Sequence, residues 1–231
     1  MKINRIKAIA RKDFKEFSRN MLLLTMPLAP IVLAVLYSRM PDEALNEGRP
    51  EIAVLTIGVA LSTVLTSAMM TMLAEEKEKH TLRGLINSPA TLLDILIGKS
   101  IVVSIITLIS VACCLFTLKI NIFIDVYMII GFMILFGFFL LLGAGLGLYV
   151  SSVSETNAYI LPITLIFGMS PMISMFINKE HILYRIANYL PLNQYIELAQ
   201  KFSLQSIIVI GIWFVSALIL NGILFKKSSF D

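Results

Sequence analysis

The sequence predicts an all-α membrane protein with six transmembrane helices, and its composition and its apolar runs are the observations that predict this fold. Hydrophobic residues make up 58% of the 231 residues and charged residues only 15%, whereas a soluble domain carries about 25% charged residues. So little charge cannot cover a water-exposed surface, so most of the surface is expected to face lipid. The apolar runs leave no room for a separate soluble domain, and residues 1–231 are expected to form a single transmembrane domain.

Six apolar segments approach the about 20 helical residues that cross the hydrocarbon core of a bilayer. These predicted spans are Met21–Tyr37, Ile52–Ala74, Ile101–Leu118, Val126–Val150, Tyr159–Ile177 and Ile207–Phe225. If both termini lie in the cytoplasm, about two thirds of the 19 Lys and Arg residues lie on that side, as the positive-inside rule favours. The net charge of +4 then reflects membrane topology, and a nucleic-acid partner is not expected.

Residues 1–20 predict an amphipathic helix that lies in the inner membrane interface. At about 100° per residue, a set of apolar side chains falls within an arc of about 80°: Ile3, Ile6, Ala10, Phe14 and Phe17. Basic residues outside that arc would face anionic headgroups. We therefore expect membrane lipids to contact Arg5, Lys12, Phe14 and Phe17. The alternative, a solvated basic tail, is disfavoured by the clean separation of the two faces.

A charged insert, residues 75–99, separates the second and third predicted spans. Three carboxylates, Glu75, Glu76 and Glu78, follow directly on the second span. Ser88 and Pro89 have the form of a helix start, with Ser as the N-cap and Pro at the first helical position. The residues alone leave two alternatives open: a helical hairpin that meets another protein, or a solvated turn followed by an interfacial helix.

The end of this insert contains a partial nucleotide-binding motif, Gly98-Lys99-Ser100. A phosphate-binding loop requires a glycine five residues before the Gly-Lys pair, and that position is Leu93. Nucleotide binding is therefore not expected here. The Lys99 side chain is expected instead to extend its aliphatic stem towards the lipid headgroups.

The segment 178–206 is too polar to span the membrane and yet is rich in Leu, Ile and Tyr. It predicts two short amphipathic helices, broken at Pro191, in the outer interface. Three tyrosines suit that depth: Tyr184, Tyr189 and Tyr195.

Within the spans, the sequence favours helix packing over chemistry. Gly143 and Gly147 form a small-xxx-small pair that lets two helices approach closely. The two histidines are far apart in the sequence and the two cysteines are adjacent, so a metal site is not expected. No nucleophile–base spacing stands out, and the chain is not expected to be an enzyme.

The charged insert carries a recognisable order of residues. The order is close to the pattern Glu-x-(Arg/Lys)-Glu-x-Gly-Thr-Leu-x-x-Leu-x-x-Ser-Pro, closed further on by Gly-Lys. The residues of this chain that match the pattern are Glu75, Lys77, Glu78, Thr81, Leu82, Leu85, Ser88, Pro89, Gly98 and Lys99. On these residues, and on Leu190-Pro191-Leu192 followed by Tyr195, the chain resembles the permease subunits of ABC-2 type transporters. The one departure is His80, where that family usually has glycine.

The resemblance implies an exporter whose energy comes from another subunit. It implies six spans, an interfacial N-terminal helix and a re-entrant helix pair before the last span. The segment Glu75–Pro89, Glu76 included, would dock on a separate ABC ATPase that binds ATP and Mg, so the chain itself would hold no cofactor. A second permease copy, identical or related, would complete a pathway in the plasma membrane for an amphipathic or hydrophobic substrate such as a peptide, drug or lipid.

Two other classes of function compete with this interpretation. A stand-alone channel or secondary transporter is disfavoured because the spans almost lack ionisable residues and show no inverted repeat. A membrane-embedded enzyme is disfavoured because no catalytic constellation is present.

Overall fold

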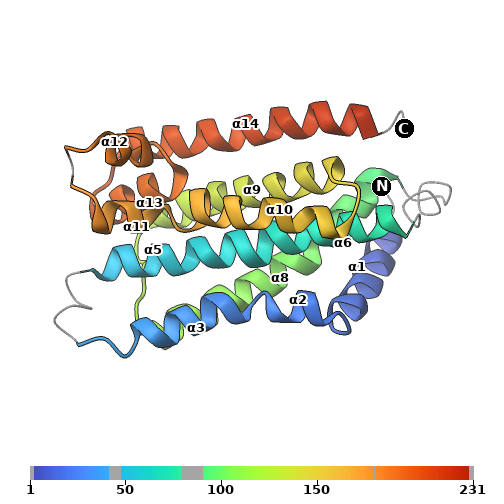
Figure 1. The fold of residues 1–231 in the computed structure, drawn as a ribbon, viewed down its shortest axis with the longest axis horizontal. Coiled ribbons are helices and arrows are strands. Elements are labelled where there is room, and N and C mark those ends of the chain that lie inside the picture. Colours follow the sequence, from blue (N-terminus) through green and yellow to red (C-terminus); the bar gives the residue numbers. More distant parts are fainter. Residues whose placement is uncertain (1–2, 42–47, 80–90, 179, 229–231) are drawn as a thin grey trace.

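The computed structural model describes residues 3–41, 48–79, 91–178 and 180–228. Within these ranges every regular element is a helix (Figure 1). The helices, of which η1 and η2 are π-helical, are α1 (Ile3–Phe17), α2 (Met21–Thr25), α3 (Leu28–Tyr37), α5 (Arg49–Ala60), η1 (Leu61–Thr66), α6 (Ser67–Glu78), α8 (Leu92–Leu118), α9 (Val126–Tyr149), α10 (Val153–Ile163), η2 (Thr164–Gly168), α11 (Ser170–Phe176), α12 (Ile182–Asn188), α13 (Pro191–Gln200) and α14 (Leu204–Ser228).

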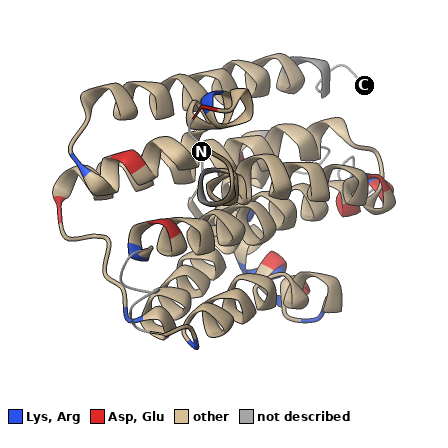
Figure 2. Cartoon of the chain, turned by 60° about the vertical axis from the view of Figure 1, so that its left-hand side comes forward, with Lys and Arg blue, Asp and Glu red and all other residues tan. Residues whose placement is uncertain are grey.

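The long helices run side by side in an elongated bundle (Figure 1). Helix α1, the end of α6 and the end of α14 lie at one end of the bundle, and α11, α12 and α13 lie at the other (Figure 1). Helix α1 turns away from the bundle axis, at 78° to the α2–α3 segment. Helix α1 is charged along its length, whereas long stretches of the helices in the bundle carry no charged residue (Figure 2).

The centre of the bundle is one continuous helix of 30 residues, built from α5, η1 and α6. It is apolar on all sides, which is typical of a helix surrounded by others. Of its most apolar window, 94% is buried. Helices α3, α8, α9, α10, α11 and α13 all contact it. The central helix therefore organises the core, and the outer helices expose apolar surface.

Four described helices are long and apolar enough to cross a membrane. They are Arg49–Glu78, Leu93–Leu118, Val126–Tyr149 and Leu204–Phe225, and the bent pair of α1 with α2–α3 brings the number to five if it counts as one span. The predicted span Met21–Tyr37 folds as α2 and α3, with a break before α3. The predicted span Tyr159–Ile177 is likewise interrupted, because Pro162 lies inside α10 and the chain bends after η2.

The helices on both sides of the charged insert extend further than predicted. Helix α6 continues to Glu78, and α8 begins at Leu92 rather than near Ile101. Thr91 is the N-cap of α8, and its hydroxyl and the Asp94 carboxylate form a capping box. Much of the segment 75–99 is therefore helical. The predicted helix start at Ser88 and Pro89 lies outside the described residues.

The predicted interfacial pair is present as two short helices, α12 and α13, with Pro191 at the start of α13. Helix α12 is largely exposed, but α13 packs against α5, α9 and α14. Tyr195 is fully buried and its hydroxyl donates a hydrogen bond to the Met128 carbonyl oxygen at 3.1 Å. Tyr195 is therefore enclosed by other helices and does not face lipid, and its depth at the outer membrane interface stays a prediction.

Gly143 and Gly147 lie where α9 crosses the central helix. A Cβ built on Gly143 would stand 2.6 Å from the Thr66 carbonyl oxygen, and one built on Gly147 would stand 2.8 Å from Leu73 Cδ1. The Thr66 hydroxyl donates to the Phe139 carbonyl oxygen at 2.8 Å, which adds a polar contact to this close approach. The two backbones meet here because neither glycine has a side chain.

The substitution Gly143→Ala is expected to destabilise the bundle by about 1–3 kcal/mol, because the added Cβ meets backbone atoms that cannot rotate away. Thermal unfolding of the detergent-solubilised protein measures the effect as a lower midpoint. Gly211→Ala is the matched control, because a Cβ at Gly211 on α14 has nothing within 4 Å. An unchanged midpoint for Gly143→Ala would contradict the close backbone contact between α9 and the central helix.

Candidate functional site

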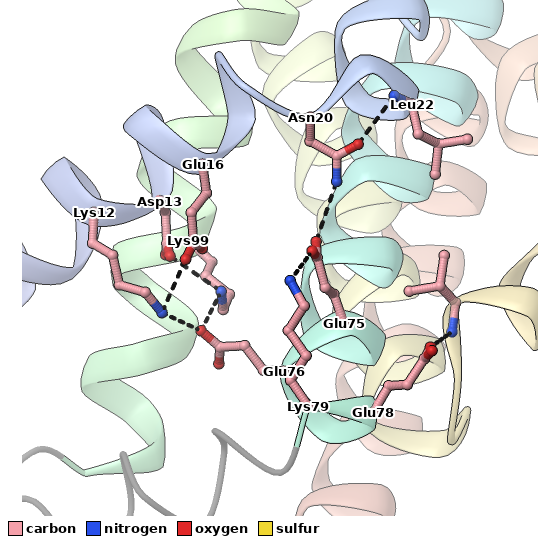
Figure 3. Close-up of polar contacts among 11 residues, drawn as sticks. Lys12, Asp13, Glu16, Asn20, Leu22, Glu75, Glu76, Glu78, Lys79 and Lys99 are labelled. Atoms are coloured by element: carbon pink, nitrogen blue, oxygen red, sulfur yellow. Dashed lines mark hydrogen bonds and ion pairs between the residues drawn. The ribbon is translucent and has the colours of Figure 1, made fainter.

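The last turn of α6 and the residue after it, Glu75–Lys79, contact several other helices with charged side chains (Figure 3). We refer to these five residues as the charged hub. Their partners outside α6 include Lys12, Asn20, Lys99, Val153 and the carbonyl oxygens of Leu148 and Val150. The charged hub lies directly before the segment 80–90, so whatever that segment does is connected to these contacts.

Glu76 pairs with two lysines from two different helices (Figure 3). Its Oε1 lies 2.9 Å from the Lys99 ammonium on α8 and 3.2 Å from the Lys12 ammonium on α1. The side chains of Lys99 and Glu76 are 1% and 6% exposed, whereas that of Lys12 is 43% exposed. One carboxylate therefore bridges α1 and α8 in a largely buried site.

Asp13 on α1 completes the set of ion pairs. Its carboxylate is 0% exposed, and its Oδ1 lies 3.3 Å from the Lys99 ammonium. Burial raises the pKa of the Asp13 carboxyl above its ordinary value, and the attraction of the Lys99 ammonium opposes this shift. Without Lys99, a buried carboxylate would lose its main compensating charge. Lys99 therefore holds two carboxylates from two helices at once.

Another carboxylate of the charged hub, Glu75, joins the α1–α2 connection to α6. Its Oε2 accepts a hydrogen bond from the Asn20 amide at 3.3 Å. The Asn20 Oδ1 in turn accepts from the Leu22 backbone N–H at 3.0 Å, so Asn20 is the N-cap of α2. The start of α2 and the end of α6 thus share one polar side chain.

Lys77 and Glu78 contact the connection between α9 and α10. The Lys77 ammonium donates to the carbonyl oxygens of Leu148 and Val150, at the C-terminal end of α9. The Glu78 carboxylate accepts from the Val153 N–H at 2.8 Å, at the N-terminal end of α10. Cations are favourable at helix C-termini and anions at helix N-termini, so each charge suits the helix end that it meets.

Close packing accompanies the ion pairs between α1 and α8. A Cβ built on Gly98 would stand 2.7 Å from Ile9 Cγ2, so α1 reaches its position only because residue 98 is glycine. The neighbouring Lys99 then meets Asp13. The Gly-Lys pair that closes the charged insert therefore has a structural role. Gly98 leaves room for the close approach of α1, and Lys99 forms the ion pair that keeps α1 in place.

A cavity of about 110 Å³ lies beside these ion pairs, between α1, α2, α6 and α8. Its lining combines the apolar side chains of Leu23 and Met72 with charged groups of both signs. In the described part of the chain, no group of three or more His, Cys, Asp or Glu side chains could hold a metal ion. The arrangement joins helices, and no reaction chemistry follows from it.

The residues predicted to contact lipid divide into two groups. Phe14 is exposed on α1, and Arg5 is half-buried there. Phe17 is buried in the core, and the buried Lys99 ammonium pairs with carboxylates. Lys12 also pairs with Glu76 but remains 43% exposed, and its contact with headgroups stays a prediction. The expectation that Lys99 reaches the lipid headgroups is therefore corrected: α1 covers the side chain and supplies its partner.

The residues predicted to contact an ATPase also divide. Glu75, Glu76, Lys77 and Glu78 belong to the charged hub and bond to other helices of the same chain. The other predicted contacts lie outside the described residues: Thr81, Leu82, Leu85, Ser88 and Pro89. The sequence pattern thus combines residues that join the protein's own helices with residues whose partners the structure does not describe.

Sequence reasoning missed Asp13 and Asn20. The buried stripe of α1 consists of Ile6, Ile9, Asp13 and Phe17, which is rotated by about 60° from the predicted apolar arc at 100° per residue. Asp13 lies four residues after Ile9 and seven residues after Ile6, so all three share one helix face. This spacing was the sequence signal that could have indicated the burial of Asp13. Ile3 and Phe14, which belong to the predicted arc, lie beside this buried stripe and are exposed.

The fold and the charged hub together define a class of protein: a multi-pass membrane protein whose described regular elements are all helices and whose charged side chains gather at one end of the central helix. The family model described as ABC-2 family transporter protein matches residues 22–228, and the chain belongs to this family. No match to a curated protein was found. Members of this family are membrane transport components that are not themselves catalytic, and they generally work with an ABC ATPase.

The substitution Lys99→Met is expected to destabilise the protein by about 3–5 kcal/mol, because it leaves Asp13 buried without its main cation. Adding Asp13→Asn removes that unpaired charge and is expected to restore a large part of the loss. Thermal unfolding of the two single variants and the double variant forms a mutant cycle that measures this coupling. Simple additivity of the two single effects would contradict the ion pair.

Proposed function

We propose that this chain is the transmembrane permease subunit of an ATP-driven ABC-2 type exporter that is powered by a separate ATPase subunit. Family membership supports a permease of an ABC exporter in general. The single observation that carries the proposal for this chain is the charged hub. It joins α6 to α1, α9 and α10, and through Lys99 it also joins α6 to α8, the other helix that flanks the segment 80–90. A segment that receives force from a partner requires such connections.

The segment that contains Thr81, Leu82, Leu85, Ser88 and Pro89 is proposed to dock in a cleft on the ATPase. The ATPase binds ATP and Mg and hydrolyses the nucleotide, and the permease holds no cofactor of its own. The charged hub then passes the movement of this segment into the bundle. In this division of roles, Glu75, Glu76, Lys77 and Glu78 contribute to coupling from inside the permease rather than at the ATPase surface.

The proposed membrane arrangement has six spans, formed by α2–α3, α5–α6, α8, α9, α10–α11 and α14. Both termini and the charged hub lie in the cytoplasm of a cell with a bacterial-type plasma membrane. The exposed Ile3 and Phe14 on α1 support a position in the inner interface, where apolar side chains enter the lipid boundary. The exposed apolar side chains of α12 support a corresponding position in the outer interface.

Two permease copies, as a homodimer or with a related chain, are proposed to form the pathway. Closure of the ATPase dimer on ATP would push on the docked segments and rock the two bundles, so that substrate leaves outward. The described connections between helices are short and include no large outer domain that could hold a soluble substrate. An amphipathic or hydrophobic molecule, such as a peptide, drug or lipid, is therefore the proposed substrate.

The variant Leu85→Asp is expected to reduce ATPase co-purification at least ten-fold, because a charge replaces an apolar contact in the docking cleft. The measurement is affinity purification of the tagged permease from membranes, followed by identification of an ATPase by mass spectrometry. Leu85 is a cleaner choice than Glu78, because Glu78 also bonds to α10 within the permease.

Leu183→Asp is the matched control, because Leu183 is an exposed leucine on α12 at the other end of the bundle (Figure 1). It is expected to leave ATPase association unchanged. Equal ATPase recovery with Leu85→Asp and the wild type would contradict docking through this segment. Absence of any ATPase from the wild-type preparation would favour a stand-alone channel or secondary transporter.

A further inference from the structure

The segment 80–90 connects Lys79, the residue after α6, to Thr91, the N-cap of α8. Any movement of this segment must therefore pass into two helices, which we call its two arms. Contacts that join the arms decide whether they move together or separately. The described contacts between the arms include the ion pair of Glu76 on α6 with Lys99 on α8, at 2.9 Å.

The same lysine brings a third helix into this connection. Its ammonium also pairs with Asp13 on α1 at 3.3 Å, and Lys12 on α1 pairs with Glu76 at 3.2 Å (Figure 3). These ion pairs connect Asp13, Lys99, Glu76 and Lys12 in a series that includes a side chain from each of the three helices, and Lys12 also pairs with Glu16 within α1 at 3.6 Å. Gly98 adds close van der Waals contact between α8 and Ile9 of α1.

Burial makes this set resist separation. Ion pairs on a protein surface exchange readily with water, but removing one partner from a buried pair leaves an uncompensated charge. Asp13 and Lys99 are almost completely buried, so moving α1 away from α8 would expose or strand both charges. Movement of α1 together with both arms avoids this cost.

We propose that Lys99 is a positioning residue that, through Asp13 and Glu76, makes α1 and the two arms of the segment 80–90 one moving body. The proposal rests on the proposed function, because it states where force from the ATPase goes next. Helix α1 carries exposed Ile3 and Phe14, so the moving body includes the element with which the permease contacts the inner interface. ATP-driven closure would therefore displace α1 as well as the arms.

The test uses the complete permease–ATPase complex in liposomes of phosphatidylethanolamine and phosphatidylglycerol. Arg11, exposed on α1, is replaced by cysteine in a Cys113→Ser/Cys114→Ser background and labelled with an environment-sensitive fluorophore. The emission change between the nucleotide-free and the ATP–vanadate-trapped complex reports movement of α1. The expected result is a clear change in the otherwise unaltered permease and a change at least three-fold smaller in Lys99→Met/Asp13→Asn.

The double variant separates positioning from mere stability, because removing both charges restores electrical balance without restoring the link between α1 and α8. Tyr127→Phe is the matched control, because it removes a polar contact outside the charged hub, the hydrogen bond from the Tyr127 hydroxyl to Asp125 at 2.8 Å, and this bond joins no other helix. It is expected to keep the full emission change.

Two results would overturn the proposal: no emission change in the otherwise unaltered complex, or an undiminished change in a folded Lys99→Met/Asp13→Asn complex. Each is judged on a preparation in which the ATPase has co-purified with the permease. Absence of the ATPase from that preparation contradicts the proposed function itself, so the two failures are distinguishable.

Discussion

A charge buried in an apolar helical bundle must find a partner, and the position of Lys99 makes this requirement the constraint on which one end of the protein depends. Its ammonium lies seven residues inside a long apolar helix, where water does not compensate it. Asp13 and Glu76 supply the compensation from two other helices. The place of α1 across the end of the bundle and the distance between α6 and α8 both follow from that pairing.

Backbone contact, rather than charge, fixes the middle of the bundle. The central helix is apolar on all sides and is enclosed by its neighbours, while Gly143 and Gly147 bring α9 against its backbone. Because lipid is as apolar as the side chains, close packing and interhelical hydrogen bonds replace the hydrophobic effect as the source of helix association. The Thr66–Phe139 hydrogen bond is one such contact. A rigid middle and a charged end are therefore built by different interactions.

Apolar runs and local signals predicted the features that depend on near neighbours in the sequence. The second, third, fourth and sixth predicted spans lie on long apolar helices, and Pro191 begins α13 as its restricted backbone favours. Features that depend on distant residues were missed. Lys99 was expected to reach the headgroups because its partner Asp13 is 86 positions away, and the burial of Tyr195 was not foreseen because Gly131, against which it packs, lies on α9.

The π-helical turn η1 determines the direction, around the helix axis, of every side chain that follows it in the central helix. A π-helical turn holds one residue more than an α-helical turn, and each residue of an α-helix advances the side-chain direction by about 100°. Without the extra residue in Leu61–Thr66, the end of α6 would be turned by about that angle. Glu76 would then point away from Lys99, and Lys77 and Glu78 would miss the helix ends that suit their charges. The π-helical turn at the centre of the bundle thus determines the direction in which the charged side chains at its end point.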